Sequence, residues 1–354
     1  MGNEKEKIKA VAMLSGGLDS SLAVKIVADQ GIEVLGVNYS TGFCLTDHRR
    51  SMSGLGAPID PKSVRNEALR AGARWRLPVE IIDISKEYMR ILTEPRHGYG
   101  SGVNPCVDCR IFMQQKTLEY MERSGAQFII TGEVVGQRPM SQMRNTLKLI
   151  EKESGCAGLI LRPLSAKILE PSKAEIEGWV DRDKMYDFHG RNRKPQMELA
   201  ARIGLDDYPQ PAGGCCFLTD PNYAKRMKDL FRHTEKKTMS TDQVMLLKVG
   251  RHFRINPLNK VIVGRNEAEN FFLEKNTGGR TRMNCLEIEG PLTLLEGGIS
   301  EEAVLTAARI TARYSDGKDR DTVEVEVRFP GEGSGSRRLT VQPLETEICE
   351  RLRI

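Results

Sequence analysis

The sequence predicts an α/β protein, with a doubly wound parallel sheet followed by a smaller C-terminal α+β domain. Strand and helix patterns alternate up to about residue 165, and a glycine–serine loop joins the first strand to the first helix. After about residue 240, short β-like runs surround a helix. Strands separated by helices of this length require right-handed crossovers and a sheet covered on both faces. We therefore expect domains at 1–170, 171–240 and 241–354, the middle one helical and irregular.

The first domain contains apolar runs of strand length, bounded by turn residues and separated by amphipathic stretches. Gly31 is placed to end the first helix, because glycine adopts the left-handed conformation that commonly follows a helix. The expected strands are 8–14, 32–40, 79–84, 126–132 and 158–164, and the expected helices are 19–31, 62–76 and 110–125.

The C-terminal domain shows alternating β-branched and polar residues, which are typical of half-buried strands. Its apolar periodicity at 300–315 predicts a single helix. The expected strands are 260–266, 285–290, 321–329 and 337–342.

Composition excludes several classes of protein. The 354 residues carry a formal net charge of +5, a mild bias toward polyanionic partners. No apolar run reaches the length of a membrane span, and the charged start, MGNEKEKIKA, is unlike a secretory signal. We therefore expect a cytoplasmic protein with no membrane partner, in which the eight cysteines form no disulfide framework.

The loop at residues 15–21, SGGLDSS, is suited to hold a phosphate. Its glycines allow backbone N–H groups to approach an anion, and the following helix adds its positive N-terminal end. The loop lacks the lysine that ends a Walker A motif, and Asp19 is suited to bind Mg²⁺. The alternative is a glycine-rich turn in which Asp19 only caps the helix.

This loop resembles the PP-loop of the ATP pyrophosphatases, which have an adenine nucleotide alpha-hydrolase-like fold. The resemblance implies that ATP and Mg²⁺ bind, that AMP is transferred to a carbonyl or carboxylate oxygen, and that pyrophosphate leaves. Ligands of parallel sheets bind at the carboxyl ends of the strands, which adds residues that follow the second strand and a later one. The expected ATP-binding residues are Ser15, Gly16, Gly17, Asp19, Ser20, Ser21, Thr41, Thr131, Gly132 and Gln137.

Cysteines form a second group with chemical potential. Cys106 and Cys109 make a C-x-x-C pair just before a helix, where the helix dipole favours thiolates. Cys216, with its neighbour Cys215, follows about a hundred residues later. Three thiols are compatible with zinc, with an iron–sulfur cluster, with a redox or persulfide pair, or with packing alone.

The cysteine segments resemble those of the tRNA thiouridine synthases. NPCVDC at 104–109 and GCCF at 214–217 resemble segments of the 2-thiouridylases, and the stretches at 131–142 and 161–164 resemble segments of the 4-thiouridine synthases. The resemblance places Cys216 on the catalytic cysteine. In three-cysteine members it implies a [4Fe–4S] cluster, here held by Cys106, Cys109 and Cys216. Arg110 and Gln114 depart from the 2-thiouridylase pattern.

The C-terminal stretch KVIVGRNEAENFFLEKN resembles the NFACT-R domain, an RNA-binding module. The resemblance implies RNA contacts, for which Arg251, Arg254, Arg265 and Asn266 are the candidates. Arginine binds phosphate well, although an ordinary solvated face is the alternative.

Together these features predict a tRNA sulfurtransferase that adenylates a uridine carbonyl and then inserts sulfur at an iron–sulfur centre, with sulfide or a persulfide carrier as the donor. Its catalytic residues are expected to be Asp19, Cys109 and Cys216. The alternatives are a cysteine-persulfide thiouridylase without a cluster, an ammonia-using ligase, and a non-catalytic RNA-binding factor that senses nucleotide.

Overall fold

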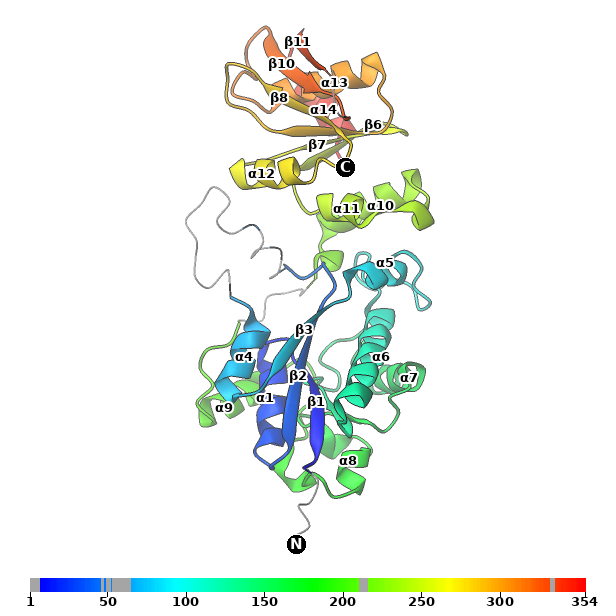
Figure 1. Cartoon of the computed structure of the whole chain (residues 1–354), viewed down its shortest axis with the longest axis vertical. Coiled ribbons are helices and arrows are strands. Elements are labelled where there is room, and N and C mark those ends of the chain that lie inside the picture. The colour runs from blue at the N-terminus through cyan, green and yellow to red at the C-terminus, as the bar shows by residue number, and fades with distance from the viewer. Residues whose placement is uncertain (1–6, 46–47, 49–51, 53–64, 210–215, 332–334) are drawn as a thin grey trace. The chain divides into compact units, whose positions relative to one another are not determined.

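The computed structural model describes residues 7–45, 48, 52, 65–209, 216–331 and 335–354 (Figure 1). The chain divides into two compact units. Of the described residues, 7–45 and 65–209 belong to the first unit, and those from 216 onward, with His48 and Met52, belong to the second. The boundaries near 170 and 240 stay predictions, because compactness alone does not show which segments fold independently.

The first unit is built on a parallel sheet with strand order β3-β2-β1-β4-β5, which confirms the predicted fold class. Its strands are β1 (Lys9–Met13), β2 (Glu33–Ser40), β3 (Val79–Asp83), β4 (Phe128–Ile130) and β5 (Ile160–Leu161). Its α-helices are α1 (Leu18–Ala28), α4 (Glu67–Trp75), α5 (Ser85–Thr93), α6 (Cys106–Ser124), α7 (Arg144–Ser154), α8 (Lys173–Ile176) and α9 (Lys194–Arg202).

Alternation along β1 explains why helices cover both faces of this sheet. Ala10 and Ala12 point to one face and pack with residues of α1 and α4. Val11 points to the other face and packs with Met121 of α6. Figure 1 shows α1 and α4 on one side of the strands and α6 on the other. This doubly wound arrangement leaves the carboxyl ends of the strands as the edge where a ligand binds.

The second unit is built on an antiparallel sheet with strand order β11-β10-β8-β9-β7-β6. Its strands are β6 (Arg251–Asn256), β7 (Asn259–Val263), β8 (Thr281–Cys285), β9 (Thr293–Glu296), β10 (Val323–Arg328) and β11 (Ser336–Val341). Its α-helices are α10 (Pro221–His233), α11 (Thr241–Leu246), α12 (Glu267–Lys275), α13 (Glu301–Arg313) and α14 (Thr346–Leu352).

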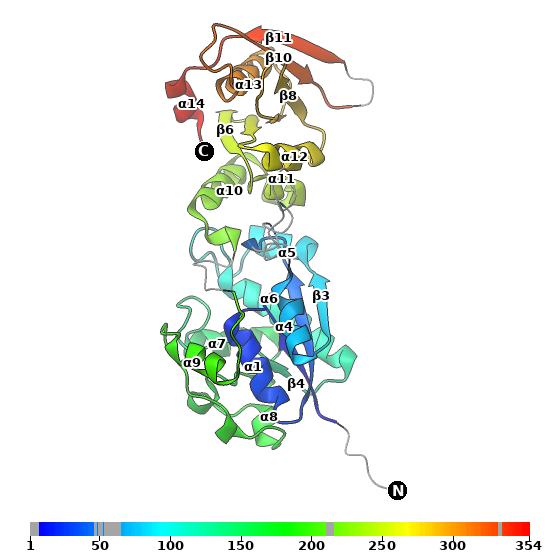
Figure 2. The same ribbon diagram turned by 90° about the vertical axis from the view of Figure 1, so that its left-hand side faces the viewer.

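Helices cover both faces of this sheet as well. The alanine-rich face of α13 packs on Val323, Val325 and Val327, whereas Leu273 of α12 packs on Ile262 from the other side. The carboxyl end of α14 lies beside β6 in both views, and the backbone N–H of Ile354 donates to the carbonyl of His252 at 3.0 Å (Figure 2).

Two expectations about this unit were wrong in detail. The strand expected at 285–290 ends at Cys285, because Glu287 has a φ of 52°, which a strand cannot accommodate. The single expected helix, 300–315, is α13, but α11, α12 and α14 accompany it.

Candidate nucleotide-binding site

The loop between β1 and α1 is fixed by its own side chains. The hydroxyls of Ser20 and Ser21 both donate to the carbonyl of Gly17 at 3.0 Å, and the Ser15 and Ser20 hydroxyls lie 3.1 Å apart. Gly16 has a φ of +75°, and a Cβ there would lie 2.3 Å from the backbone carbon of Glu67. The loop is therefore held tightly at the start of an eleven-residue helix.

Gly132, just after β4, packs against the back of this loop. A Cβ on Gly132 would lie 2.4 Å from the backbone nitrogen of Ser20 and 2.5 Å from the carbonyl carbon of Asp19. No side chain fits at such distances unless backbone moves. The contact explains why glycine follows Thr131 at this point.

Replacing Gly132 by alanine is therefore expected to push the loop out of place. We expect a loss of about 1–3 kcal/mol of stability, as for other overpacked sites, together with weaker ATP binding. Thermal unfolding and equilibrium titration with ATP measure both effects. Gly298→Ala is the control, because no heavy atom lies within 4 Å of a Cβ built there. Equal behaviour of the two variants would contradict the expectation.

A cavity of about 460 Å³ opens beside the loop at the carboxyl ends of β1, β2 and β4. Seven of the ten predicted ATP-binding residues line it: Ser15, Gly17, Asp19, Ser20, Thr131, Gly132 and Gln137. It also has lining residues that the sequence did not single out as ATP-binding: Asn38, Tyr39, Arg110, Met113, Gln142, Arg191 and Arg193.

The other three predicted residues support the site from outside the lining. Gly16 contacts the start of α4, and the Ser21 hydroxyl is bonded within the first turn of α1. Thr41 is buried, and its hydroxyl accepts a hydrogen bond from the backbone N–H of Phe43 at 3.3 Å.

One oxygen of the Asp19 carboxylate accepts two hydrogen bonds. Its Oδ2 accepts from Nη2 of Arg193 at 2.8 Å and from Nε2 of Gln137 at 3.1 Å. Among the described residues, neither Oδ1 of Asp19 nor Nε of Arg193 has a hydrogen-bond partner, although both atoms are buried. A buried carboxylate oxygen without a partner suits a cation ligand, so the residues present fit the Mg²⁺ that the PP-loop implies.

Arg193 is positioned by the segment that precedes α9. A parallel bridge joins Val135 to His189, and the backbone N–H of Gly190 donates to the carbonyl of Val135 at 2.7 Å. This bridge brings Arg191 and Arg193 to the cavity wall. In the sequence, Arg191 and Arg193 stand out only as part of the basic run GRNRK at 190–194, and this run does not predict that they reach the cavity.

A buried ion pair forms the floor of the site. Glu133 and Arg162 are each 4 % exposed or less, and Nε of Arg162 lies 3.1 Å from Oε2 of Glu133. Nη1 of Arg110 lies 3.5 Å from the other oxygen. Burial alone would raise the pKa of the Glu133 carboxyl, but Arg162 and Arg110 outweigh burial and lower it. Glu133 is therefore ionised at neutral pH, and it holds Arg110 at the cavity.

The C-x-x-C pair occupies the first turn of α6, and both thiols are partly exposed. Between them, the buried carboxylate of Asp108 accepts from the backbone N–H groups of Arg96 and His97 at 3.1 and 3.0 Å. Nδ1 of His97 also lies 3.1 Å from this carboxylate. Asp108 thus fixes the preceding loop onto the helix and gives the two thiols a rigid base.

Cys216 begins the second unit and is partly exposed, whereas Cys215 lies outside the described residues. No group of three or more His, Cys, Asp or Glu side chains suited to a metal occurs within the described ranges. Cluster ligation by Cys106, Cys109 and Cys216 therefore stays a prediction.

The predicted RNA-binding residues of the second unit make bonds within that unit. Nη2 of Arg254 lies 2.5 Å from Oδ2 of Asp229, and the guanidinium of Arg265 pairs with Glu269. Asn266 caps α12, and Arg251 stacks over the Tyr314 ring with 4.8 Å between guanidinium and centroid. Their role in RNA binding stays a prediction.

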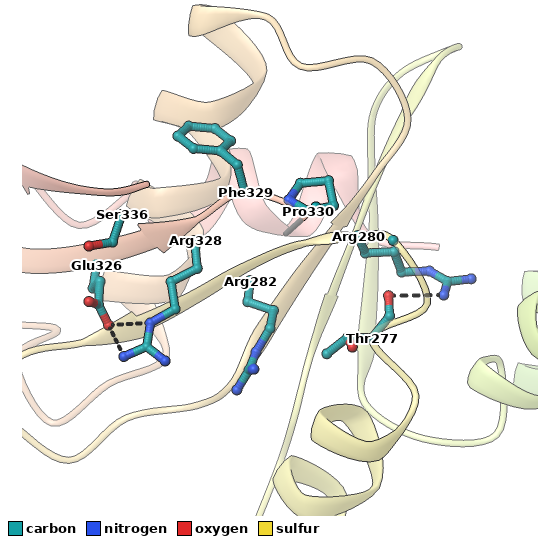
Figure 3. Close-up of a pocket in the computed structure, with 10 residues that line it drawn as sticks. Thr277, Arg280, Arg282, Glu326, Arg328, Phe329, Pro330 and Ser336 are labelled. Atoms are coloured by element: carbon teal, nitrogen blue, oxygen red, sulfur yellow. Dashed lines mark hydrogen bonds and ion pairs between the residues drawn. The ribbon is translucent and has the colours of Figure 1, made fainter. Parts of the chain in front are cut away.

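A second cavity, of about 520 Å³, lies in this unit beside β8 and β10. Figure 3 shows Arg282, Arg328 and Glu326 along it, with Arg328 bonded to Glu326 at 2.9 Å. Arg282 pairs with Glu274 at 2.6 Å, and Arg280 pairs with Asp242 and Glu296. Each arginine named here therefore has a carboxylate partner within the unit.

The first unit is an α/β domain with a candidate nucleotide cavity, the second is mainly antiparallel, and a family model matches part of each. Residues 8–167 match the tRNA methyl transferase HUP domain, and residues 250–353 match the NFACT protein RNA binding domain. The two matches lie in different units of the chain, the first mainly in the α/β unit and the second in the antiparallel unit.

The chain is also similar to curated proteins named tRNA-specific 2-thiouridylases. The chain is 26 % identical over 228 residues to the tRNA-specific 2-thiouridylase MnmA of Xanthobacter autotrophicus, covering 63 % of this chain and 54 % of the relative. It is 30 % identical over 237 residues to MnmA of Leptospira biflexa, covering 63 % and 56 %. The chain spans about half the length of the curated relatives it matches.

A solved 4-thiouridine synthetase–RNA complex with bound ATP is 18 % identical, covering 57 % of this chain and 54 % of that one, with a TM-score of 0.32. A likeness of that size carries no argument. In the part of the chain that the structure describes, no helix has both the length and the apolar character needed to cross a bilayer.

Proposed function

We propose that the protein is an ATP-dependent tRNA thiouridylase. The observation that carries the proposal is that helix α6 contributes both the C-x-x-C pair and residues that line the PP-loop cavity. α6 begins with the C-x-x-C pair, and its residues Arg110 and Met113 line the PP-loop cavity. An adenylated substrate in that cavity would therefore lie at the helix that presents Cys106 and Cys109. The thiouridylase label of the distant relatives supports the same chemistry.

In the first step, the uridine carbonyl oxygen attacks the α-phosphate of ATP, and pyrophosphate leaves. The loop N–H groups and the hydroxyls of Ser15 and Ser20 bind phosphate oxygens, and Arg193 supplies the cation that the loop itself lacks. Bound Mg²⁺, held by Asp19, would neutralise charge on the phosphates. The uridine oxygen, otherwise a poor leaving group, becomes part of an AMP that departs readily.

In the second step, sulfur replaces AMP. The comparisons give no support to an iron–sulfur centre, and the persulfide alternative needs only thiols and a donor. A persulfide carrier transfers its outer sulfur to the Cys109 thiolate, and the thiolate of the carrier leaves. The outer sulfur of the resulting Cys109 persulfide attacks the activated carbon, and AMP leaves. Attack by the Cys106 thiolate on the inner sulfur releases thiouridine and leaves a disulfide, which a dithiol reductant returns to thiols.

The test combines the protein with unmodified tRNA transcript, ATP labelled at the α-phosphate, a persulfide carrier and a dithiol reductant. We expect AMP, pyrophosphate and thiouridine in equal amounts, detected by chromatography and by mass spectrometry of digested tRNA. Release of ADP and phosphate would contradict the proposal. Binding of tRNA and ATP without pyrophosphate release would identify a non-catalytic factor, and incorporation of nitrogen from ammonia would identify a ligase.

A further inference from the structure

Helix α10 presents a uniformly basic face to solvent. Lys225, Lys228 and Arg232 are all exposed, and at about 3.6 residues per turn they fall within roughly 60° of arc. None of the three takes part in an ion pair with any residue that the structure describes. The acidic residue within the helix, Asp229, is buried on another side, and Glu235 follows the helix end.

Other exposed cations of the same unit have acidic residues beside them. Arg337 and Arg353 each pair with a glutamate, and Arg338 lies opposite Glu326 in the sheet. Lys275 and Arg351 each directly follow a glutamate in the sequence. Lys318 and Arg320 lie in the turn 316–321, where three aspartates alternate with them. Surface charges of mixed sign are the ordinary arrangement of a solvated face, so the uniform sign on α10 stands apart.

The remaining sides of α10 attach it firmly to its own unit. Arg254 of β6 bonds the buried carboxylate of Asp229, and the Tyr223 hydroxyl donates to the carbonyl of Val244 at 3.0 Å. Arg226 donates to the carbonyls of Leu247 and Gly250 at 2.8 and 3.0 Å. Arg254, a predicted RNA contact, thus helps to hold the helix that carries the basic face.

We propose that the face formed by Lys225, Lys228 and Arg232 is a docking surface for the phosphate backbone of RNA. Three cations along about 10 Å of a fixed helix match a polyanion, whose binding releases counterions. RNA is the polyanion favoured here, because an RNA-binding domain match begins at residue 250 of the same unit. The face lies outside that match. Only the choice of tRNA as the particular RNA rests on the proposed function.

The test neutralises the face in the full chain with Lys225→Gln, Lys228→Gln and Arg232→Gln together. Binding of an unmodified tRNA transcript is followed by fluorescence anisotropy at several salt concentrations. We expect affinity to fall on the order of tenfold, and the slope of log K against log salt to decrease by about 2, since each phosphate contact contributes roughly 0.7–0.9. Thermal unfolding should stay unchanged, because all three side chains are exposed.

The control variant removes the same charge elsewhere, with Lys318→Gln, Arg320→Gln and Arg337→Gln, and should leave affinity and slope close to the unmodified values. Equal losses of tRNA affinity in both variants would show that net charge alone determines binding, and would overturn the proposal. A loss confined to Arg282→Gln with Arg328→Gln would move the RNA site to the cavity of Figure 3 and also overturn it. Binding to phosphatidylserine vesicles that depends on α10, with tRNA binding unaffected, would overturn it in favour of a membrane surface.

The same samples separate this inference from the proposed function. ATP binding should be unaffected by the α10 variant, because the PP-loop cavity lies in the other unit. If the unmodified protein binds tRNA through α10 but forms no thiouridine, the docking surface stands and the thiouridylase proposal fails. If the α10 variant forms thiouridine at the rate of the unmodified protein and binds tRNA equally well, the thiouridylase proposal stands and the docking surface fails.

Discussion

Cys109→Ser is expected to abolish thiouridine formation, with a loss on the order of a thousandfold or more, and to leave ATP binding within about twofold of the unmodified protein. The expected loss is this large because removal of a nucleophile ends the covalent route altogether. ATP binding persists because serine has nearly the shape of cysteine and Cys109 does not line the cavity. Thiouridine is measured in digested tRNA, and ATP affinity by equilibrium titration.

Cys156→Ala is the matched control within the same unit. Burial raises the pKa of the Cys156 thiol, so this residue stays protonated and unreactive at neutral pH. Its replacement should lower stability but not thiouridine formation per folded molecule. Retention of more than half of the activity by Cys109→Ser would remove Cys109 from the mechanism.

Cys106→Ser distinguishes the persulfide route from a cluster. If Cys106 only releases the product by forming a disulfide, excess dithiothreitol should restore most of the activity, because an external thiol can attack the same sulfur. If Cys106 is a cluster ligand, dithiothreitol restores nothing, and bound iron is lost together with activity. The iron content of the unmodified and Cys106→Ser proteins is measured on the same preparations.

The part of the nucleotide site that the sequence predicts is the part made by neighbouring residues. The loop from Ser15 to Ser21 is one continuous turn, and its glycine at position 16 and its serines perform local tasks that the motif itself displays. Thr131 and Gly132 follow a strand, so the parallel topology brings them to the same edge.

Arg193 could not be found in this way. It reaches Asp19 across 174 residues, from a segment beyond the end of the family match. Its position depends on the bridge between Val135 and His189, and no hydrophobic periodicity in the sequence predicts that bridge. A run of arginines in a sequence can lie at many places on a protein, and only the fold determines which place it occupies.

In the C-terminal unit, residues of the GRN motif and its neighbours make hydrogen bonds and ion pairs within the unit itself. Asn270 closes the GRN segment against β9: its Oδ1 accepts from the backbone N–H of Leu292 at 3.0 Å, and a Cβ on Gly264 would lie 2.0 Å from that oxygen. Arg265 and Glu269 are likewise paired within the motif. Residues that define a fold can resemble ligand contacts in a sequence, because both demand particular side chains.

Asp19→Asn is expected to slow release of pyrophosphate about 100- to 1,000-fold, because charge stabilisation around the phosphates is usually the largest catalytic contribution at such a site. Asparagine keeps the shape of the side chain but removes its charge. It weakens the hold on Mg²⁺ at Oδ1, and it leaves Arg193 and Gln137 without a carboxylate at Oδ2. Pyrophosphate release is measured against Mg²⁺ concentration.

Arg193→Gln separates the two tasks of Asp19. If Asp19 serves only to position Arg193, both single variants and the double variant lose the same activity, and the Mg²⁺ dependence does not change. If Asp19 also binds Mg²⁺, its variant loses more and needs a higher Mg²⁺ concentration for half-maximal rate. Arg193→Gln should then weaken binding of ATP but not of adenosine, because a guanidinium recognises phosphates and not the nucleoside. Unchanged pyrophosphate release in Asp19→Asn would exclude the carboxylate from the chemistry and leave it only as the partner of Arg193 and Gln137.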